Sequence, residues 1–256
     1  MKLNKDKLVG FIMLLLAFLG ILLWYFLDMD KINKALSFNF GNAKDLLQLA
    51  KGLGNTLFIT IVAFIIGLLI GLIITFILKI ESDAIIVIAL KKLCHAYVSI
   101  FRGTPMVVQL LIIYFIIFAF FKGDAIYIAM IGFGLNSGAY VSEILRGGIS
   151  SVPKGQYEAG RSLGLTYKET MTKIVLPQGI RNSLPSLGNE LITLVKETSI
   201  VGYVGAFDLT LAFKKLANAT YDFETVYLVM GIVYFLLVFI LVKLLNCFER
   251  RLQKNA

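Results

Sequence analysis

Long apolar runs separated by short polar segments dominate the chain. Residues 9–27 are apolar and uncharged over 19 residues, enough to cross a hydrocarbon core of about 30 Å at about 1.5 Å per residue. Five further spans are expected near 54–78, 105–121, 125–145, 183–206 and 225–246. The pattern predicts an all-α, polytopic membrane protein with about six transmembrane helices.

Two stretches have more than one interpretation. A secretory signal at residues 9–27 would be long, and the following DMDKINKA offers no good cleavage site, so we expect a retained anchor. Residues 84–100 are also apolar, but Lys91, Lys92 and His95 would be costly facing lipid. We expect them to form an interfacial helix or a cytoplasmic extension of the third span.

A polar segment, residues 150–178, interrupts the membrane pattern. Pro153 suits a first helical position, and Gly164 suits the left-handed residue that ends a helix. Thr166 and Glu169 fit the capping box of a second helix, which Pro177 is expected to end. The segment is therefore expected to be a compact helix-turn-helix outside the bilayer.

Composition and charge agree with this reading. Hydrophobic residues make up 58% of the chain and charged residues 16%, which is too apolar for a soluble domain of this length. Of 25 Lys and Arg residues, 17 fall on one side of the expected spans, 7 on the other, and Lys196 within a span. The positive-inside rule puts both termini and the polar segment in the cytoplasm. The net charge of +9 needs no nucleic-acid partner, because anionic lipid accounts for it.

Catalytic chemistry has little support in the sequence. His95 beside Cys94, with Cys247 far along the chain, is not a metal site, and packing roles are expected for all three. No phosphate-binding Gly-x-x-x-x-Gly-Lys-Ser/Thr sequence occurs, so the chain is not itself an ATPase. We expect no bound cofactor and no metal. Gly67 and Gly71 fit either close helix packing within the fold or a dimer contact.

The polar segment resembles the cytoplasmic EAA coupling loop of importer-type ABC permeases. The resemblance rests on Glu158-Ala159-Gly160, Gly164 and the run Ile174-Val175-Leu176-Pro177. Gly160 departs from the pattern, because the family usually has Ala there. SIFRGTPMVVQL at 99–110, GAYVSEILRGGI at 138–149 and LPSLGNELITLVKETSIV at 184–201 are similar to the polar amino-acid (histidine/glutamine/arginine-type) subgroup.

This resemblance implies a type I ABC permease fold and a domain layout. Residues 1–50 would add a transmembrane anchor and an external linker, residues 51–250 would form the permease domain, and residues 251–256 a cytoplasmic tail. The chain would lie in a bacterial plasma (inner) membrane.

The resemblance also implies partners. These are two ATPases that bind ATP and Mg, a second identical or paralogous permease subunit, an extracytoplasmic solute-binding protein and an amino-acid substrate. The segment at 150–178 would dock on the ATPases through eight residues: Tyr157, Glu158, Ala159, Gly160, Arg161, Gly164, Leu176 and Pro177. Tyr157, Leu163, Leu165 and Tyr167 would anchor it. An inert amphipathic loop lying on lipid headgroups is the alternative.

Polar residues within the spans are candidates for the substrate pathway. Asn189, Glu190, Thr193, Lys196 and Glu197 recur at three- and four-residue spacings on neighbouring strips of one helix. Ionisable groups at this depth usually face a bundle interior or a wet cavity. Glu190 is expected either to accept the amino or guanidinium group of a substrate or to form a buried clamp with Lys196 or Arg102. The first reading slightly favours a basic amino acid.

Other polar residues have weaker assignments. Gln109, Asn136, Tyr140 and Glu143 are expected either to line the same cavity or to hydrogen-bond neighbouring helices. Arg102, Lys196 and Glu197 are expected to act as a gate or as structural ion pairs. The expected function is the transmembrane subunit of an amino-acid ABC importer. The alternatives are a permease for methionine, osmoprotectants or metals and, more distantly, a nucleotide-independent channel or a membrane-embedded enzyme.

Overall fold

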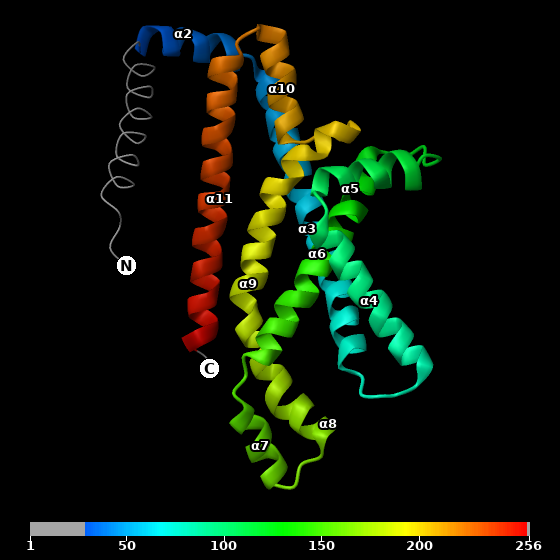
Figure 1. Ribbon diagram of the computed structural model, residues 1–256. Coiled ribbons are helices and arrows are strands. Elements are labelled where there is room, and N and C mark those ends of the chain that lie inside the picture. The colour runs from blue at the N-terminus through cyan, green and yellow to red at the C-terminus, as the bar shows by residue number, and fades with distance from the viewer. Residues whose placement is uncertain (1–28, 255–256) are drawn as a thin grey trace, which may run out of the picture.

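The computed structural model describes residues 29–254, and every regular element in that range is helical (Figure 1). The anchor expected at residues 9–27 lies outside this range. The region expected to be an external linker holds α2 (Met29–Phe40) and the start of α3 (Ala43–Lys79). α2 lies across one end of the bundle, at a steep angle to α3 (Figure 1).

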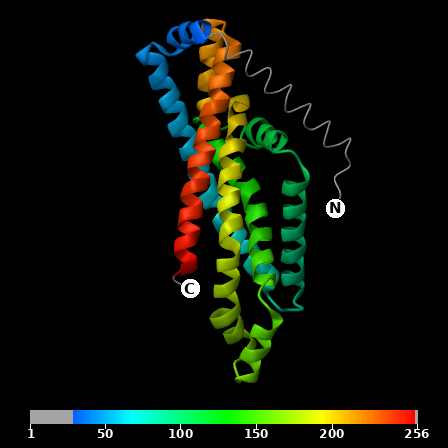
Figure 2. The same cartoon turned by 90° about the vertical axis from the view of Figure 1, so that its left-hand side faces the viewer.

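Long helices form the body of the molecule. Three described helices are long and apolar enough to cross a membrane: α3, α6 (Ala125–Ser150) and α11 (Phe223–Lys254). The expected span at 183–206 is made by α9 (Leu176–Glu197) and the 3-10 segment η3 (Thr198–Val204). α9 is less apolar than these three, but it packs along α6 and runs beside the other long helices (Figure 2).

The third span differs from the straight helix expected at 105–121. α4 (Ile85–Gly103) is followed by α5 (Met106–Ile112) and the π-helical η1 (Ile113–Ile117), which turn from α4 by 113°. Pro105 causes the break, because it lacks an N–H and leaves Thr104 extended. Cys94 and Val98 of α4 pack in the bundle, so α4 is a helix of the bundle rather than an interfacial helix. The 113° bend also means that α4 does not extend a straight span at 105–121.

Glycine allows α3 and α6 to pack closely. A Cβ on Gly67 would lie 2.8 Å from the Ser137 side chain, and one on Gly71 would lie 2.4 Å from Val141. The pair at positions 67 and 71 therefore serves helix packing within the chain. The main core lies beside this contact and includes Ile59, Leu110, Phe133 and Leu194.

The two ends of the bundle differ. At one end, α10 (Leu209–Thr220) packs against α3 and α11. At the other end, α7 (Lys154–Ser162), α8 (Tyr167–Thr170) and the π-helical η2 (Met171–Val175) project beyond the long helices (Figure 1). We call residues 150–178 the projecting loop.

Pro177 does not end the second helix of this loop, contrary to expectation. α8, η2 and α9 follow one another without interruption from Tyr167 to Glu197. The wider π-helical turn lies immediately before Pro177, where an α-helix would lose a hydrogen bond. The Gln178 side chain also donates to the carbonyl oxygen of Ile174, at 2.9 Å. Pro153 lies one residue before its helix rather than at its first position.

Candidate functional site

The turn of the projecting loop has a defined backbone geometry. Gly164 has φ +82°, and the N–H of Leu165 donates to the Gly160 carbonyl while that of Gly164 donates to the Arg161 carbonyl. This pair of bonds is the Schellman ending of a helix. Arg161 adds a 2.6 Å bond from its guanidinium to the Leu165 carbonyl. The expected left-handed Gly164 is confirmed.

A capping box starts the second helix of the loop. The Thr166 hydroxyl accepts from the N–H of Glu169, and the Glu169 carboxylate accepts from the N–H of Thr166. Lys173 lies 3.3 Å from the same carboxylate. These hydrogen bonds, first those from Thr166 and then the one from Lys173, lower the pKa of Glu169 to about 2. The turn between α7 and α8 is therefore held at both ends.

Gly160 is where the two short helices touch. It is buried, and a Cβ there would lie 2.7 Å from Cγ2 of Thr170 and 3.0 Å from Cδ1 of Ile174. Thr170 is fully buried, and its hydroxyl has no hydrogen-bond partner in the described part of the chain. The contact is tighter than the small-residue packing expected from the sequence, because even alanine would not fit without a shift.

An apolar cluster fastens the loop to the end of α6. Ile149 and Val152 pack there against Val175, and Tyr157, Met171 and Leu176 flank them. Tyr157 also meets Tyr167 edge to face, with ring centroids 5.9 Å apart. Burial, and then the neighbouring Glu81, raise the pKa of the Tyr167 phenol.

Leu163 is not an anchor, although the sequence suggested that role. It is 80% exposed at the tip of the loop. Glu158, Ala159 and Arg161 are exposed on the same short helix, so the tip presents an apolar residue beside a polar edge. Such a surface suits a cleft on a soluble protein.

Glu190 lies in the interface between α9 and α6. It is 9% exposed, and its Oε1 accepts a 2.8 Å hydrogen bond from the Ser137 hydroxyl. Within the described residues, no ion pair joins Glu190 to Lys196 or Arg102. The expected clamp with either cation is therefore wrong. Ser137 was missed because a serine in an apolar run carries no signal of its partner.

The other polar residues of α9 lie on different sides of the helix. Asn189 and Lys196 are exposed, while Thr193 and Glu197 are half-buried. The Thr193 hydroxyl donates to the carbonyl of Asn189, at 3.0 Å. Asn189, Thr193 and Lys196, at three- and four-residue spacings, share one strip of the helix. Glu197 is seven residues from Glu190 and lies on the same strip as that carboxylate.

Gln109 and Asn136 close the broken end of α4. The Gln109 amide donates to the carbonyls of Phe101 and Thr104 at 2.8 and 2.9 Å, and Asn136 donates to the Gln109 oxygen at 2.8 Å. A helix that ends within a bundle needs partners for its last carbonyls. Of the two roles considered for these residues, helix contact is the one seen.

Arg102 lies in the last turn of α4, beside α6. Its guanidinium is 3.3 Å from Glu143 and stands over the Tyr140 ring at 5.5 Å. Arg146 holds the same carboxylate at 2.6 Å. Glu143 is therefore occupied by two arginines, and the structural ion pair expected for Arg102 is present.

Residues 29–254 contain no group of three or more His, Cys, Asp or Glu side chains that could hold a metal ion. Cys94 is buried in the bundle and Cys247 is exposed, and both are free thiols. The geometry instead joins the projecting loop to a helix that carries a buried carboxylate. Such an arrangement can transmit movement and bind a polar ligand.

Known proteins share this architecture. Residues 84–254 match the family model described as "Binding-protein-dependent transport system inner membrane component". The chain is 42% identical over 161 residues to the arginine transport system permease protein ArtQ of Bacillus subtilis (strain 168), covering 62% of this chain and 74% of that protein. The L-cystine transport system permease protein TcyB of the same organism is 39% identical over 160 residues, covering 62% and 68%.

A solved structure agrees with these relatives. The crystal structure of an amino acid ABC transporter with histidines matches with a TM-score of 0.75 and 37% sequence identity. The match covers 81% of this chain and 95% of that one.

Proposed function

Because the chain belongs to the family of binding-protein-dependent transport system inner membrane components, we propose that it forms the translocation pathway of an ATP-driven amino-acid importer. It is an integral membrane permease subunit. ATP binding and hydrolysis, with Mg, belong in this proposal to a separate partner chain.

One observation carries the proposal: the second helix of the projecting loop continues into the helix that holds Glu190. α8, η2 and α9 run as one helix from Tyr167 to Glu197. The Schellman turn and the capping box fix the tip relative to this helix. A push on the loop by a docked ATPase would therefore travel to the α6–α9 interface along one uninterrupted helical path.

The ATPase contact would be the exposed tip. Leu163 would enter a cleft of the ATPase, and Glu158 and Arg161 would form polar contacts at its rim. Tyr157, Gly160 and Leu176 would act from within the loop by holding its shape. Two ATPases and a second permease subunit, identical or paralogous, complete the proposed assembly, and a solute-binding protein delivers the substrate from outside.

An amino acid is the substrate class that the relatives support, because they are named as arginine and cystine permeases. Glu190 would accept the cationic group of the substrate after giving up or sharing its bond with Ser137. Asn189 and Thr193 would line the approach. A carboxylate in a cavity of low dielectric suits a cation, which favours a basic amino acid.

Orientation is part of the same proposal. The projecting loop and both termini would lie in the cytoplasm, in accordance with the positive-inside rule. The end formed by α2 and α10 would then face the solute-binding protein (Figure 1). The membrane would be a bacterial plasma membrane.

Reconstitution tests the function. The chain would be placed in proteoliposomes with candidate ATPases and binding proteins, and uptake of labelled arginine, histidine, glutamine and methionine would be followed. Uptake should require both ATP and a binding protein. Uptake that persists without nucleotide would identify a channel, and methionine uptake without uptake of the polar amino acids would overturn the preference for a basic amino acid.

A further inference from the structure

A positively charged cavity lies between the ends of α3, α4 and α6 nearest the projecting loop. Its volume is about 410 Å³, within the range of small-ligand sites. Four basic side chains line it together with two hydroxyls: Lys79, Lys91, His95 and Arg146, with Thr75 and Ser150. We call this the cationic pocket. Lys91 and His95 are four residues apart and so lie on one face of α4, which is the face that lines the pocket.

The charges of this pocket are only partly balanced. Arg146 is paired with Glu143, which lies outside the lining. Lys79 and Lys91 form no ion pair with a carboxylate of the described residues, and no acidic residue lines the pocket. Two lysines without an ion pair among the described residues therefore line one cavity, which favours an anion. Glu81 lines only an adjoining cavity.

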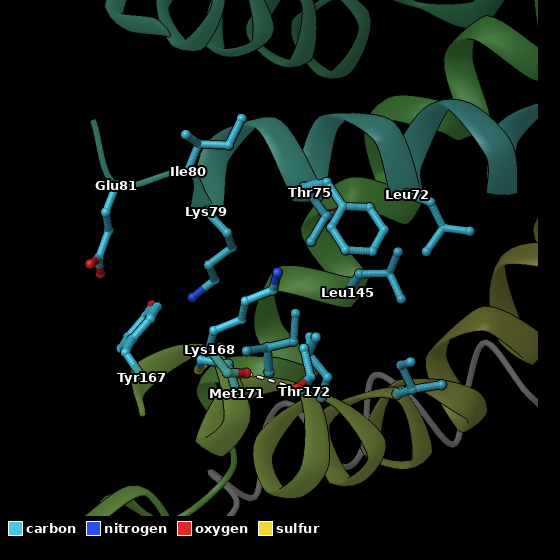
Figure 3. Close-up of a pocket in the computed structure, with 14 residues that line it drawn as sticks. Leu72, Thr75, Lys79, Ile80, Glu81, Leu145, Tyr167, Lys168, Met171 and Thr172 are labelled. Carbon is cyan, nitrogen blue, oxygen red and sulfur yellow. Dashed lines mark hydrogen bonds between the residues drawn. The ribbon is translucent and has the colours of Figure 1, made fainter. Parts of the chain in front are cut away.

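A second, mainly apolar cavity of about 740 Å³ adjoins the first. The two share Thr75 and Lys79. In Figure 3, Leu72 and Leu145 lie at one end of this apolar cavity, and Lys79 lies toward the other, opposite Lys168. A ligand that fills both spaces needs an anionic group and a long apolar tail.

We propose that the cationic pocket binds the phosphate headgroup of an anionic phospholipid, with an acyl chain lying in the apolar cavity beside Leu72. Lysine ammonium groups and hydroxyls suit a phosphate, and basic pockets between membrane helices bind lipid headgroups of the cytoplasmic leaflet. The outer face of α4 is apolar, with Ile86 and Leu93 exposed. An apolar exposed face suits contact with lipid, which would bring lipid close to the pocket. The same lipid would touch Met171 and Thr172 of the projecting loop.

Native mass spectrometry and thermal unfolding of the full chain in detergent test this site. Phosphatidylglycerol should remain bound and raise the melting temperature, and phosphatidylcholine should do neither. Lys91→Gln should weaken phosphatidylglycerol binding about five-fold, and the double change with Lys79→Gln about 25-fold. Lys92→Gln is the matched control, because Lys92 is exposed beside Lys91 but does not line the pocket.

Three outcomes would overturn the proposal. Equal retention of the two lipids would show that the pocket does not select for the charge of the headgroup. An equal loss in the Lys91 and Lys92 variants would mean that any surface cation serves. Full stabilisation by inorganic phosphate or glycerol phosphate would assign the pocket to a free anion, because neither probe uses the apolar cavity.

Discussion

The Ser137 hydroxyl on α6 donates a 2.8 Å hydrogen bond to the Glu190 carboxylate on α9. Glu190→Gln preserves this acceptor and removes the charge. We expect the melting temperature to change little and the apparent affinity for a cationic amino acid to fall about 5- to 150-fold, equivalent to about 1–3 kcal/mol. Uptake and unfolding would be measured on the same preparations.

Two further variants separate binding from folding at this position. Ser137→Ala leaves the buried carboxylate without its donor, so it should cost about 1–3 kcal/mol of stability. Ser186→Ala, at an exposed position on the same helix, should spare both readouts. Normal uptake in Glu190→Gln would reject the ligand role, and a stability loss in that variant as large as in Ser137→Ala would favour a structural one.

Gly160→Ala should separate the two helices of the projecting loop. The added methyl would lie 2.7 Å from Cγ2 of Thr170, and overpacking of this kind costs about 1–3 kcal/mol. We expect weaker copurification of the ATPase and faster amide exchange in residues 154–170. Gly155→Ala is the control, because nothing lies within 4 Å of a Cβ there. Adding Thr170→Ala to Gly160→Ala should restore both readouts, and failure of this rescue would contradict the packing argument.

Acid should loosen the same loop through Glu169. Its pKa is lowered to about 2 in the folded chain, from an ordinary value of 4.5. The ionised carboxylate therefore contributes its full stabilisation of the loop when the pH is above 4.5. That contribution fades as the pH falls from 4.5 toward 2. Amide protection of residues 163–170, corrected for intrinsic exchange, should decline over this interval. In Glu169→Gln the decline should be absent, and an unchanged decline would assign it to another group.

Cysteine labelling tests the orientation. In a background without Cys94 and Cys247, Lys44→Cys should react with an impermeant maleimide on intact cells, and Lys154→Cys only after permeabilisation. Both positions are exposed, so access depends on the side of the membrane. The reverse pattern would place the projecting loop outside and remove its role in ATPase docking.

The local signals of the projecting loop were readable from the sequence because they act over a few residues. Gly164 and the pair Thr166 and Glu169 form the predicted turn and capping box. The prediction for Pro177 was wrong because a π-helical turn removed the conflict that an α-helix would meet. Sequence rules for helix ends assume α geometry and do not anticipate this alternative.

Contacts between helices were harder to foresee. The polar residues of α9 were predicted from their spacing. The hydrogen-bond partner of Glu190, however, is Ser137 on α6, which lies 53 residues earlier in the sequence. Gln109 looked like a pathway residue, yet it closes the end of α4. The role of Gln109 depends on the bend at Pro105, which hydrophobic periodicity does not report. The contact of Ser137 with Glu190 depends on how α6 packs against α9.

The π-helical turn at Met171–Val175 sets the rotational phase between the loop and the α9 interface. A π-helical turn holds about one residue more than an α-helical one, and each residue turns an α-helix by about 100°. Because the wider turn absorbs the extra residue, winding the same residues as regular α-helix would rotate the loop by about 100° relative to the contact of Glu190 with Ser137. The π-helical turn thus determines how the loop is rotated about the axis of α9.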